Sequence, residues 1–140
     1  MDRFEVFFPG GKKVAANYRG FTITTDQPRF GGGEDSAPSP FELFLASLAT
    51  CAGFYVLSFC DQRGIPTEGI RLSQEMQVDP RTHMIANVAI RIELPEGFPE
   101  QYREAVVRAA ETCTVKKHLQ FPPAIEVYAS TARVPAGAGA

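Results

Sequence analysis

The sequence has no tryptophan, only two histidines and only three cysteines among its 140 residues. His83 and His118 lie far apart and no C-x-x-C pair occurs, so no group of residues has the spacing of a structural zinc site. Three cysteines cannot all pair within one chain, which argues against a disulfide framework and favours a reducing compartment. We therefore expect neither a metal ion nor a bound cofactor.

The chain also lacks an excess of either sign of charge. Fourteen Lys and Arg side chains face sixteen Asp and Glu side chains, giving a formal net charge of −2. The only adjacent basic pairs are Lys12–Lys13 and Lys116–Lys117, whereas a nucleic-acid surface needs a clustered basic face. The start of the chain, MDRFEVFF, lacks the basic and then apolar pattern of a secretory signal. These features predict a cytoplasmic protein that binds no nucleic acid.

One long apolar run stands out against this background. Residues 41–60 contain a single charge, Glu42, and are long enough to cross a bilayer. Ser47 and Thr50 interrupt the run, and the amphipathic strands on either side need a core to cover. A helix that is apolar all round is also typical of a buried central helix. Because one domain of this size cannot cover such a helix on every face, we expect a second subunit, with a membrane span as the alternative.

The ends of this helix carry clear signals. Ser39 can cap the start, Pro40 suits the first helical position, and Glu42 completes an S-x-x-E capping box. Gly64 and Pro66 prevent continuation beyond about residue 63.

The rest of the chain reads as short strands and one amphipathic helix. Turn residues separate three strand candidates (3–8, 13–18 and 21–26), and a Gly- and Pro-rich loop fills 29–40. Alternating patterns predict strands at 69–79 and 83–94, with one slip that fits a bulge. A helix begins at Pro99, a further helical turn can follow residue 113, and residues 124–130 form the last strand candidate. The order βββ-α-ββ-α-β is α+β, in one domain (1–132) with a C-terminal tail (133–140).

The three cysteines differ in their predicted surroundings. Cys51 lies in the middle of the long helix, so a useful thiolate there needs a nearby cation or hydrogen-bond donor, and plain packing is the alternative. Cys60 lies nine residues further on, about half a turn around the helix, and is predicted to pack in the core. Cys113 ends the second helix just before Lys116 and Lys117. The amides of a following helix would favour its thiolate, with packing as the competing interpretation.

Three motifs together resemble the OsmC/Ohr superfamily. They are TDQP (25–28), GGGEDSAPSPFELFLASLATC (31–51) and C-x-V-x-x-x-L (113–119). The pattern P-x-E-L-x-L-A-S-L-x-x-C within the second is fairly specific, and the order of elements agrees over about residues 4–131. The chain is most similar to the general OsmC-like branch rather than to the organic hydroperoxide resistance proteins proper.

The resemblance implies an intertwined homodimer with the long central helices in its core. It also implies a cysteine-based thiol peroxidase that reduces organic hydroperoxides. Cys51 would be the peroxidatic residue that becomes a sulfenic acid, and Cys113 would resolve it as a disulfide. A dithiol reductant of the lipoyl or thioredoxin type would restore the two thiols.

The sequence departs from the family's peroxidases at the activating residues. Those proteins pair an arginine in the first β-turn with a glutamate at the start of the central helix. Here Lys12 and Lys13 occupy that turn, and Phe41 stands at the glutamate position beside Glu42. Because lysine lacks the two-pronged contact of arginine, the activating candidates are Glu42, Lys12, Lys13 and Arg19. The alternative function is a non-catalytic dimer that binds a hydrophobic small molecule or acts in a stress response.

Overall fold

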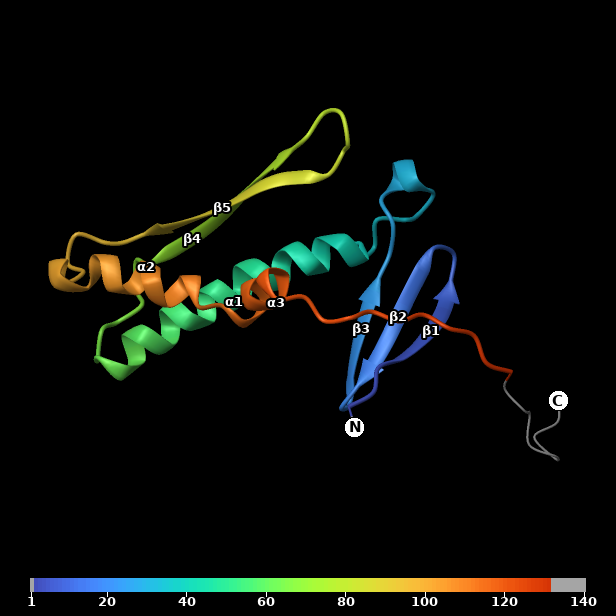
Figure 1. Ribbon diagram of the computed structural model, residues 1–140, viewed down its shortest axis with the longest axis horizontal. Helices are drawn as coiled ribbons and strands as arrows, with labels where there is room; N and C mark the ends of the chain where they lie inside the picture. Colours follow the sequence, from blue (N-terminus) through green and yellow to red (C-terminus); the bar gives the residue numbers. More distant parts are fainter. Residues whose placement is uncertain (1, 132–140) are drawn as a thin grey trace.

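A long helix, α1 (Pro40–Gln62), forms the axis on which the other elements are arranged (Figure 1). The computed structural model describes residues 2–131, and the tail expected at 133–140 lies outside the described residues. One sheet holds three strands and the other holds two, all antiparallel, which confirms the α+β class. The remaining elements are β1 (Glu5–Gly10), β2 (Lys13–Tyr18), β3 (Phe21–Thr25), η1 (Arg29–Gly31), β4 (Arg71–Val78), β5 (Ile85–Glu93), η2 (Glu100–Tyr102), α2 (Arg103–Glu111) and α3 (Thr114–Gln120).

The first sheet is the three-stranded meander predicted from the turn residues, in the order β1-β2-β3. Gly10 and Gly11 both have positive φ at the β1–β2 turn, a conformation that favours glycine. The sheet lies beside the N-terminal end of α1 and apart from β4, β5 and α2 (Figure 1). An apolar groove of about 280 Å³ separates the sheet from Pro40 and Leu43 of α1.

Helix α1 begins and ends where the sequence predicts. The Ser39 hydroxyl accepts a hydrogen bond from the Glu42 backbone N–H, and the Glu42 carboxylate accepts one from the Ser39 N–H, which completes the capping box. At the other end, Gly64 adopts φ 64° and the Ile65 N–H donates to the Cys60 carbonyl at 2.9 Å. A left-handed residue with this bond is a common helix stop.

The β4–β5 hairpin lies along α1 (Figure 1). Its register shifts between Gln77 and Val78, which confirms the slip expected from the sequence pattern. The Gln74 side-chain amide donates to the Leu45 carbonyl of α1 at 3.0 Å, joining the sheet to the helix.

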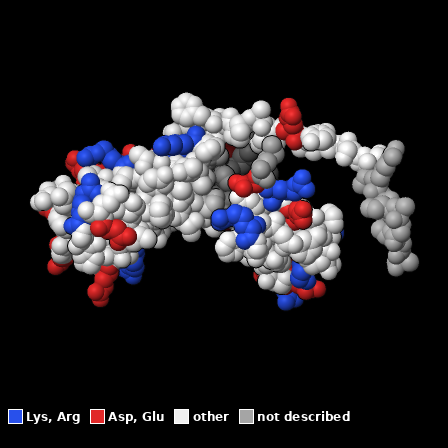
Figure 2. All heavy atoms as spheres, turned by 90° about the horizontal axis from the view of Figure 1, so that it is seen from below, with Lys and Arg blue, Asp and Glu red and all other residues white. Residues whose placement is uncertain are grey.

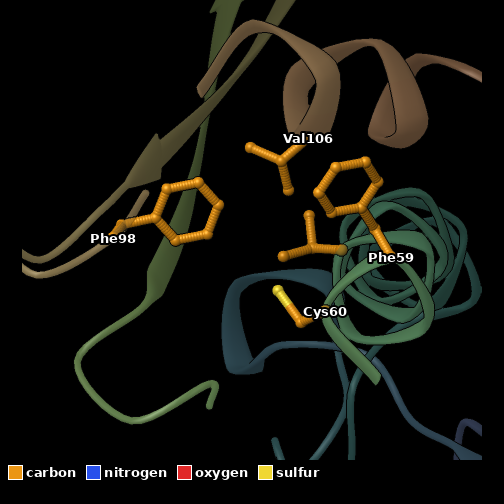
Figure 3. Packing of buried hydrophobic residues seen from close by; sticks show 5 residues of the cluster. Phe59, Cys60, Phe98 and Val106 are labelled. Atoms are coloured by element: carbon orange, nitrogen blue, oxygen red, sulfur yellow. The ribbon is translucent and has the colours of Figure 1, made fainter. Parts of the chain in front are cut away.

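The core lies between the C-terminal half of α1, helix α2 and the loop before it. Figure 3 shows Phe59, Cys60, Phe98 and Val106 converging there, and Val56 completes the cluster. Cys60 is fully buried. Burial raises the pKa of its thiol, and the nearby Asp61 carboxylate raises it further. The predicted packing role of Cys60 is therefore confirmed.

The helix predicted from Pro99 starts with the short turn η2 and continues as α2, which ends at Glu111. The further helical turn expected after residue 113 is confirmed as α3, and Cys113 is its N-cap. One prediction after residue 98 is wrong. Residues 124–130 were expected to form a strand but pair with no strand within residues 2–131. A strand is stable only beside another strand edge, and the side chains of this segment are exposed, as 84% for Ile125 and 94% for Val127 illustrate.

Much of α1 is uncovered. It is the one described helix long and apolar enough to cross a membrane, yet only 28% of its most apolar window is buried inside the chain. Phe54 and Leu57 expose 60% and 43% of their surface. In Figure 2 the charged side chains gather toward the two ends of the molecule, and the stretch between them carries few. A single copy of the chain therefore leaves a large apolar surface.

Candidate redox site

Helix packing brings Cys51 and Cys113 together. Cys51 lies on the fourth turn of α1, and Cys113 lies at the junction of α2 and α3, both of which pack against α1. Both residues are free thiols, and their side chains are in hydrogen-bonding contact. Cys51 is half-buried, whereas Cys113 exposes only 1% of its surface.

Cys113 is the N-cap of α3. Its sulfur accepts a hydrogen bond from the Lys116 backbone N–H at 3.5 Å. Burial raises the pKa of the Cys113 thiol, and the nearby Cys51 sulfur raises it further. The sequence favoured Cys113 as the residue stabilised by the amides of a following helix, but its sulfur stays protonated and suits a donor to its neighbour.

Cys51 has the opposite character. Burial raises the pKa of its thiol, but hydrogen bonds from the Val115 backbone N–H, the Cys113 thiol and the Thr114 backbone N–H outweigh burial, so that the pKa is lowered. These donors come from the start of α3 and not from the helix that carries Cys51. The donor that a thiolate in the middle of a helix requires is thus supplied across the α1–α3 contact.

A second contact joins the same two elements. The Tyr55 hydroxyl and the Thr114 hydroxyl lie 2.8 Å apart, although the residues are 59 positions apart in the sequence. Tyr55 follows Cys51 by one helical turn and therefore shares its face of α1. No sequence motif marks Tyr55, and only its spacing of four residues from Cys51 indicates it.

A cavity of about 400 Å³ lies between α1, β5, α2 and α3, and neither Cys51 nor Cys113 lines it. Its volume is within the usual range of small-molecule sites. Two charged residues, Glu111 and Lys116, line it together with Leu48, Ala52, Val88, Ile90, Ile92, Val107, Ala110 and Leu119. The cavity is therefore mainly apolar, with one group of each charge.

The basic candidates lie elsewhere in the chain. Lys12 lies in the β1–β2 turn, and Lys13 begins β2 and forms an ion pair with Glu34 at 3.1 Å. Arg19 lies at the β2–β3 turn, where its guanidinium stacks over the rings of Tyr18 and Phe21. Within residues 2–131 of one copy, no basic side chain contributes to the lowered pKa of Cys51.

Glu42 also lies away from Cys51 in the same chain. Its carboxylate caps α1, and the step of nine residues to Cys51 places the two about 13.5 Å apart along the axis and half a turn around the helix. The structure thus unites the two cysteines but does not bring Glu42, Lys12, Lys13 or Arg19 to them within one copy.

The TDQP motif contains a buried carboxylate that the sequence analysis left without a role. Asp26 accepts hydrogen bonds from the Ser36 hydroxyl at 2.6 Å, the Gln27 N–H at 2.7 Å, and the Ser36 and Glu34 N–H groups. These bonds, led by that of the Ser36 hydroxyl, lower the pKa of Asp26 to about 2. Asp26 therefore organises the loop that leads into α1.

Comparisons with known proteins agree with this architecture. The family model of the OsmC-like proteins matches residues 32–128. A search of curated proteins found no significant match. All three solved structures described next are below 25% identity and therefore bear on the fold.

One similar structure is a Psychrobacter arcticus protein proposed to act in the osmotic stress and detoxification response, with 23% identity and a TM-score of 0.71 over 84% of this chain and 87% of that one. Another is an organic hydroperoxide resistance protein, OsmC, from Legionella pneumophila, with 20% identity and a TM-score of 0.55 over 86% and 89%. A third is a Vibrio cholerae protein, proposed to confer organic hydroperoxide resistance, with captopril in one of its active sites. It has 18% identity and a TM-score of 0.58 over 86% and 85%.

Proposed function

Because the chain belongs to the family of OsmC-like proteins, we propose that it is a cysteine-based thiol peroxidase that reduces organic hydroperoxides. The observation that carries the proposal is the contact between a Cys51 thiol of lowered pKa and a protonated Cys113 thiol. The thiolate is the nucleophilic form of cysteine, and a second thiol within reach can resolve its oxidation product. The organic hydroperoxide resistance of the similar Legionella protein supports the substrate class.

The reaction has three balanced steps. The Cys51 thiolate attacks the outer oxygen of the hydroperoxide, the O–O bond breaks, and the alkoxide takes up a proton to leave as an alcohol. The Cys51 sulfenic acid then condenses with the Cys113 thiol, forming a disulfide and releasing water. A dithiol reductant of the lipoyl or thioredoxin type exchanges with this disulfide, restores both thiols and leaves as its own disulfide.

We further propose that the working unit is a homodimer. The exposed face of α1 around Phe54 and Leu57 supports this, because monomers rarely expose apolar patches of such extent. The unpaired residues 124–130, with Ile125, Val127 and Tyr128 exposed, would add to a sheet edge of the second copy. A dimer would also allow the basic candidates Lys12, Lys13 and Arg19 of one copy to reach Cys51 of the other.

The proposed compartment is the cytoplasm. OsmC-like proteins are soluble, and a second copy covering α1 removes the reason for placing that helix in a bilayer. Three unpaired cysteines are also more typical of a reducing compartment.

The proposal predicts stoichiometric consumption of peroxide and thiols. Mixing the reduced protein with cumene hydroperoxide should consume one peroxide per chain and two of the three thiols. A peroxide assay measures the peroxide consumed, and thiol titration of the unfolded product measures the thiols lost. Neither needs tryptophan fluorescence, which this chain lacks. Cys51→Ser should abolish consumption, whereas Cys113→Ser should stop at a sulfenic acid that dimedone traps. Cys60→Ala is the matched control, and unchanged peroxide with three intact thiols in the wild type would contradict the proposal.

The apolar cavity between α1, β5, α2 and α3 favours one alternative function, the binding of a hydrophobic small molecule without catalysis. Native mass spectrometry of protein isolated from cells, before and after organic extraction, separates the two functions. A retained and extractable mass in a protein that leaves peroxide untouched would favour the binding function.

A further inference from the structure

Tyr55 lies where a side chain of α1 can hold the start of α3. Its hydroxyl contacts the Thr114 hydroxyl at 2.8 Å. Its ring is half-buried and meets the Phe54 ring edge to face, with 5.8 Å between centroids. A tyrosine ring held by neighbours has few rotamers left, so its hydroxyl marks a fixed point on α1.

Thr114 is the residue through which this contact reaches the redox site. It follows the Cys113 N-cap directly and is the first residue of α3. Its own backbone N–H and that of Val115 donate hydrogen bonds to Cys51. Any movement of Thr114 away from α1 therefore lengthens two of the three hydrogen bonds that stabilise the Cys51 thiolate.

We propose that Tyr55 is a positioning residue for Cys51, whose hydroxyl holds the α2–α3 junction so that the Thr114 and Val115 backbone N–H groups stay directed at the thiolate. The proposal deepens the proposed function because it concerns the same cysteine. The ionisation of Cys51 is nevertheless measurable whether or not the protein reduces peroxides.

Other ionisable groups near the junction are known and can be controlled. They are Cys113, Glu111 at the end of α2, and Lys116, Lys117 and His118 on α3. His118 Nδ1 lies 2.7 Å from the Thr114 carbonyl oxygen, so this ring contacts the same residue. A His118→Gln background removes that imidazole and keeps a polar side chain of similar length.

The test is the pH dependence of Cys51 alkylation, read residue by residue by mass spectrometry. Tyr55→Phe keeps the ring and removes only the hydroxyl. We expect the apparent pKa of Cys51 to rise by about 0.5, which lowers its thiolate fraction below the pKa by about threefold. Tyr102→Phe is the matched control, since Tyr102 packs against Phe59 of α1 in the core, and it should leave the Cys51 profile unchanged.

A double-mutant cycle assigns the effect to the contact with Thr114. Thr114→Val should shift the Cys51 profile as Tyr55→Phe does, the double variant should shift it no further, and Thr114→Ser should retain the wild-type profile. An unchanged profile in Tyr55→Phe, or additive shifts in the double variant, would overturn the proposal. A wild type that spares peroxide while Tyr55→Phe still shifts Cys51 would refute the peroxidase function and retain the positioning role.

Discussion

Cys51 and Cys113 are the same side chain in two environments that push their ionisation apart. Cys51 receives three hydrogen bonds to its sulfur and has a lowered pKa, whereas Cys113 is buried beside that sulfur and has a raised one. The pair thus holds one nucleophile and one proton donor in contact. At the residue scale, the roles follow from the hydrogen bonds that the Cys51 sulfur receives and from the burial of Cys113.

Asp26 provides a second test at this scale. Its pKa of about 2 lies below the ordinary 3.8, and the hydrogen bond from the Ser36 hydroxyl is the largest cause. The carboxylate therefore contributes stability that is fully present above pH 3.8 and is lost as the pH falls through about 2. Asp26→Asn should lower the melting temperature at neutral pH, and thermal scans should show the difference from wild type shrinking in acid.

Asp35→Asn is the matched control for Asp26. Asp35 lies in the same loop, is exposed and has a φ of 55° that asparagine also accepts. A loss of stability in Asp35→Asn as large as in Asp26→Asn would show that the buried hydrogen bonds of Asp26 are not the cause.

Elements with local signals were predictable from the sequence, and those that depend on distant partners were not. The capping box at Ser39 and the stop at Gly64 are encoded within a few residues, so both ends of α1 were correct. Residues 124–130 have the pattern of a strand, but no local pattern states where the partner edge lies. Likewise, the backbone N–H groups at the start of α3 reach Cys51 as well as Cys113 because α3 packs on α1, and no local pattern states that contact.

Variants of the capping box distinguish two roles for Glu42, the capping of α1 and the activation of Cys51. Ser39→Ala removes the cap and should lower stability by about 1 kcal/mol, a fall of a few degrees in melting temperature. Glu42→Gln keeps a side chain that fits the capping box, so it should cost less stability and leave peroxide reduction intact. Loss of peroxide reduction by tenfold or more in Glu42→Gln, with stability retained, would instead assign Glu42 to the redox site of the second copy.

At the scale of the whole molecule, one copy leaves its longest helix largely uncovered. The apolar run at 41–60 predicted this uncovered surface, because a helix that is apolar on every face has more apolar surface than the rest of a 140-residue chain can cover. The groups that a second copy would bring near Cys51 could not be predicted, since a sequence does not state the geometry between chains.

The exposed face of α1 allows a direct test of the dimer. Phe54→Glu combined with Leu57→Glu places two carboxylates on the exposed apolar face and should convert a dimer to monomers in analytical ultracentrifugation, because burying unpaired charges is unfavourable. Met84→Glu, an exposed apolar residue between β4 and β5, is the control and should leave the mass unchanged. A double variant that keeps the wild-type mass at low concentration would contradict the proposed interface.

The cap on α3 ties the folding of that helix to the oxidation state of the site. In the reduced protein the Cys113 sulfur accepts the Lys116 N–H, and under the proposed mechanism that sulfur is drawn to Cys51 when the disulfide forms. The reduced state then keeps a cap that the oxidised state weakens, and by linkage this moves the reduction potential of the pair to more positive values. The seven residues of α3 are thus less stable after peroxide oxidises the pair, and reduction of the disulfide restores their cap.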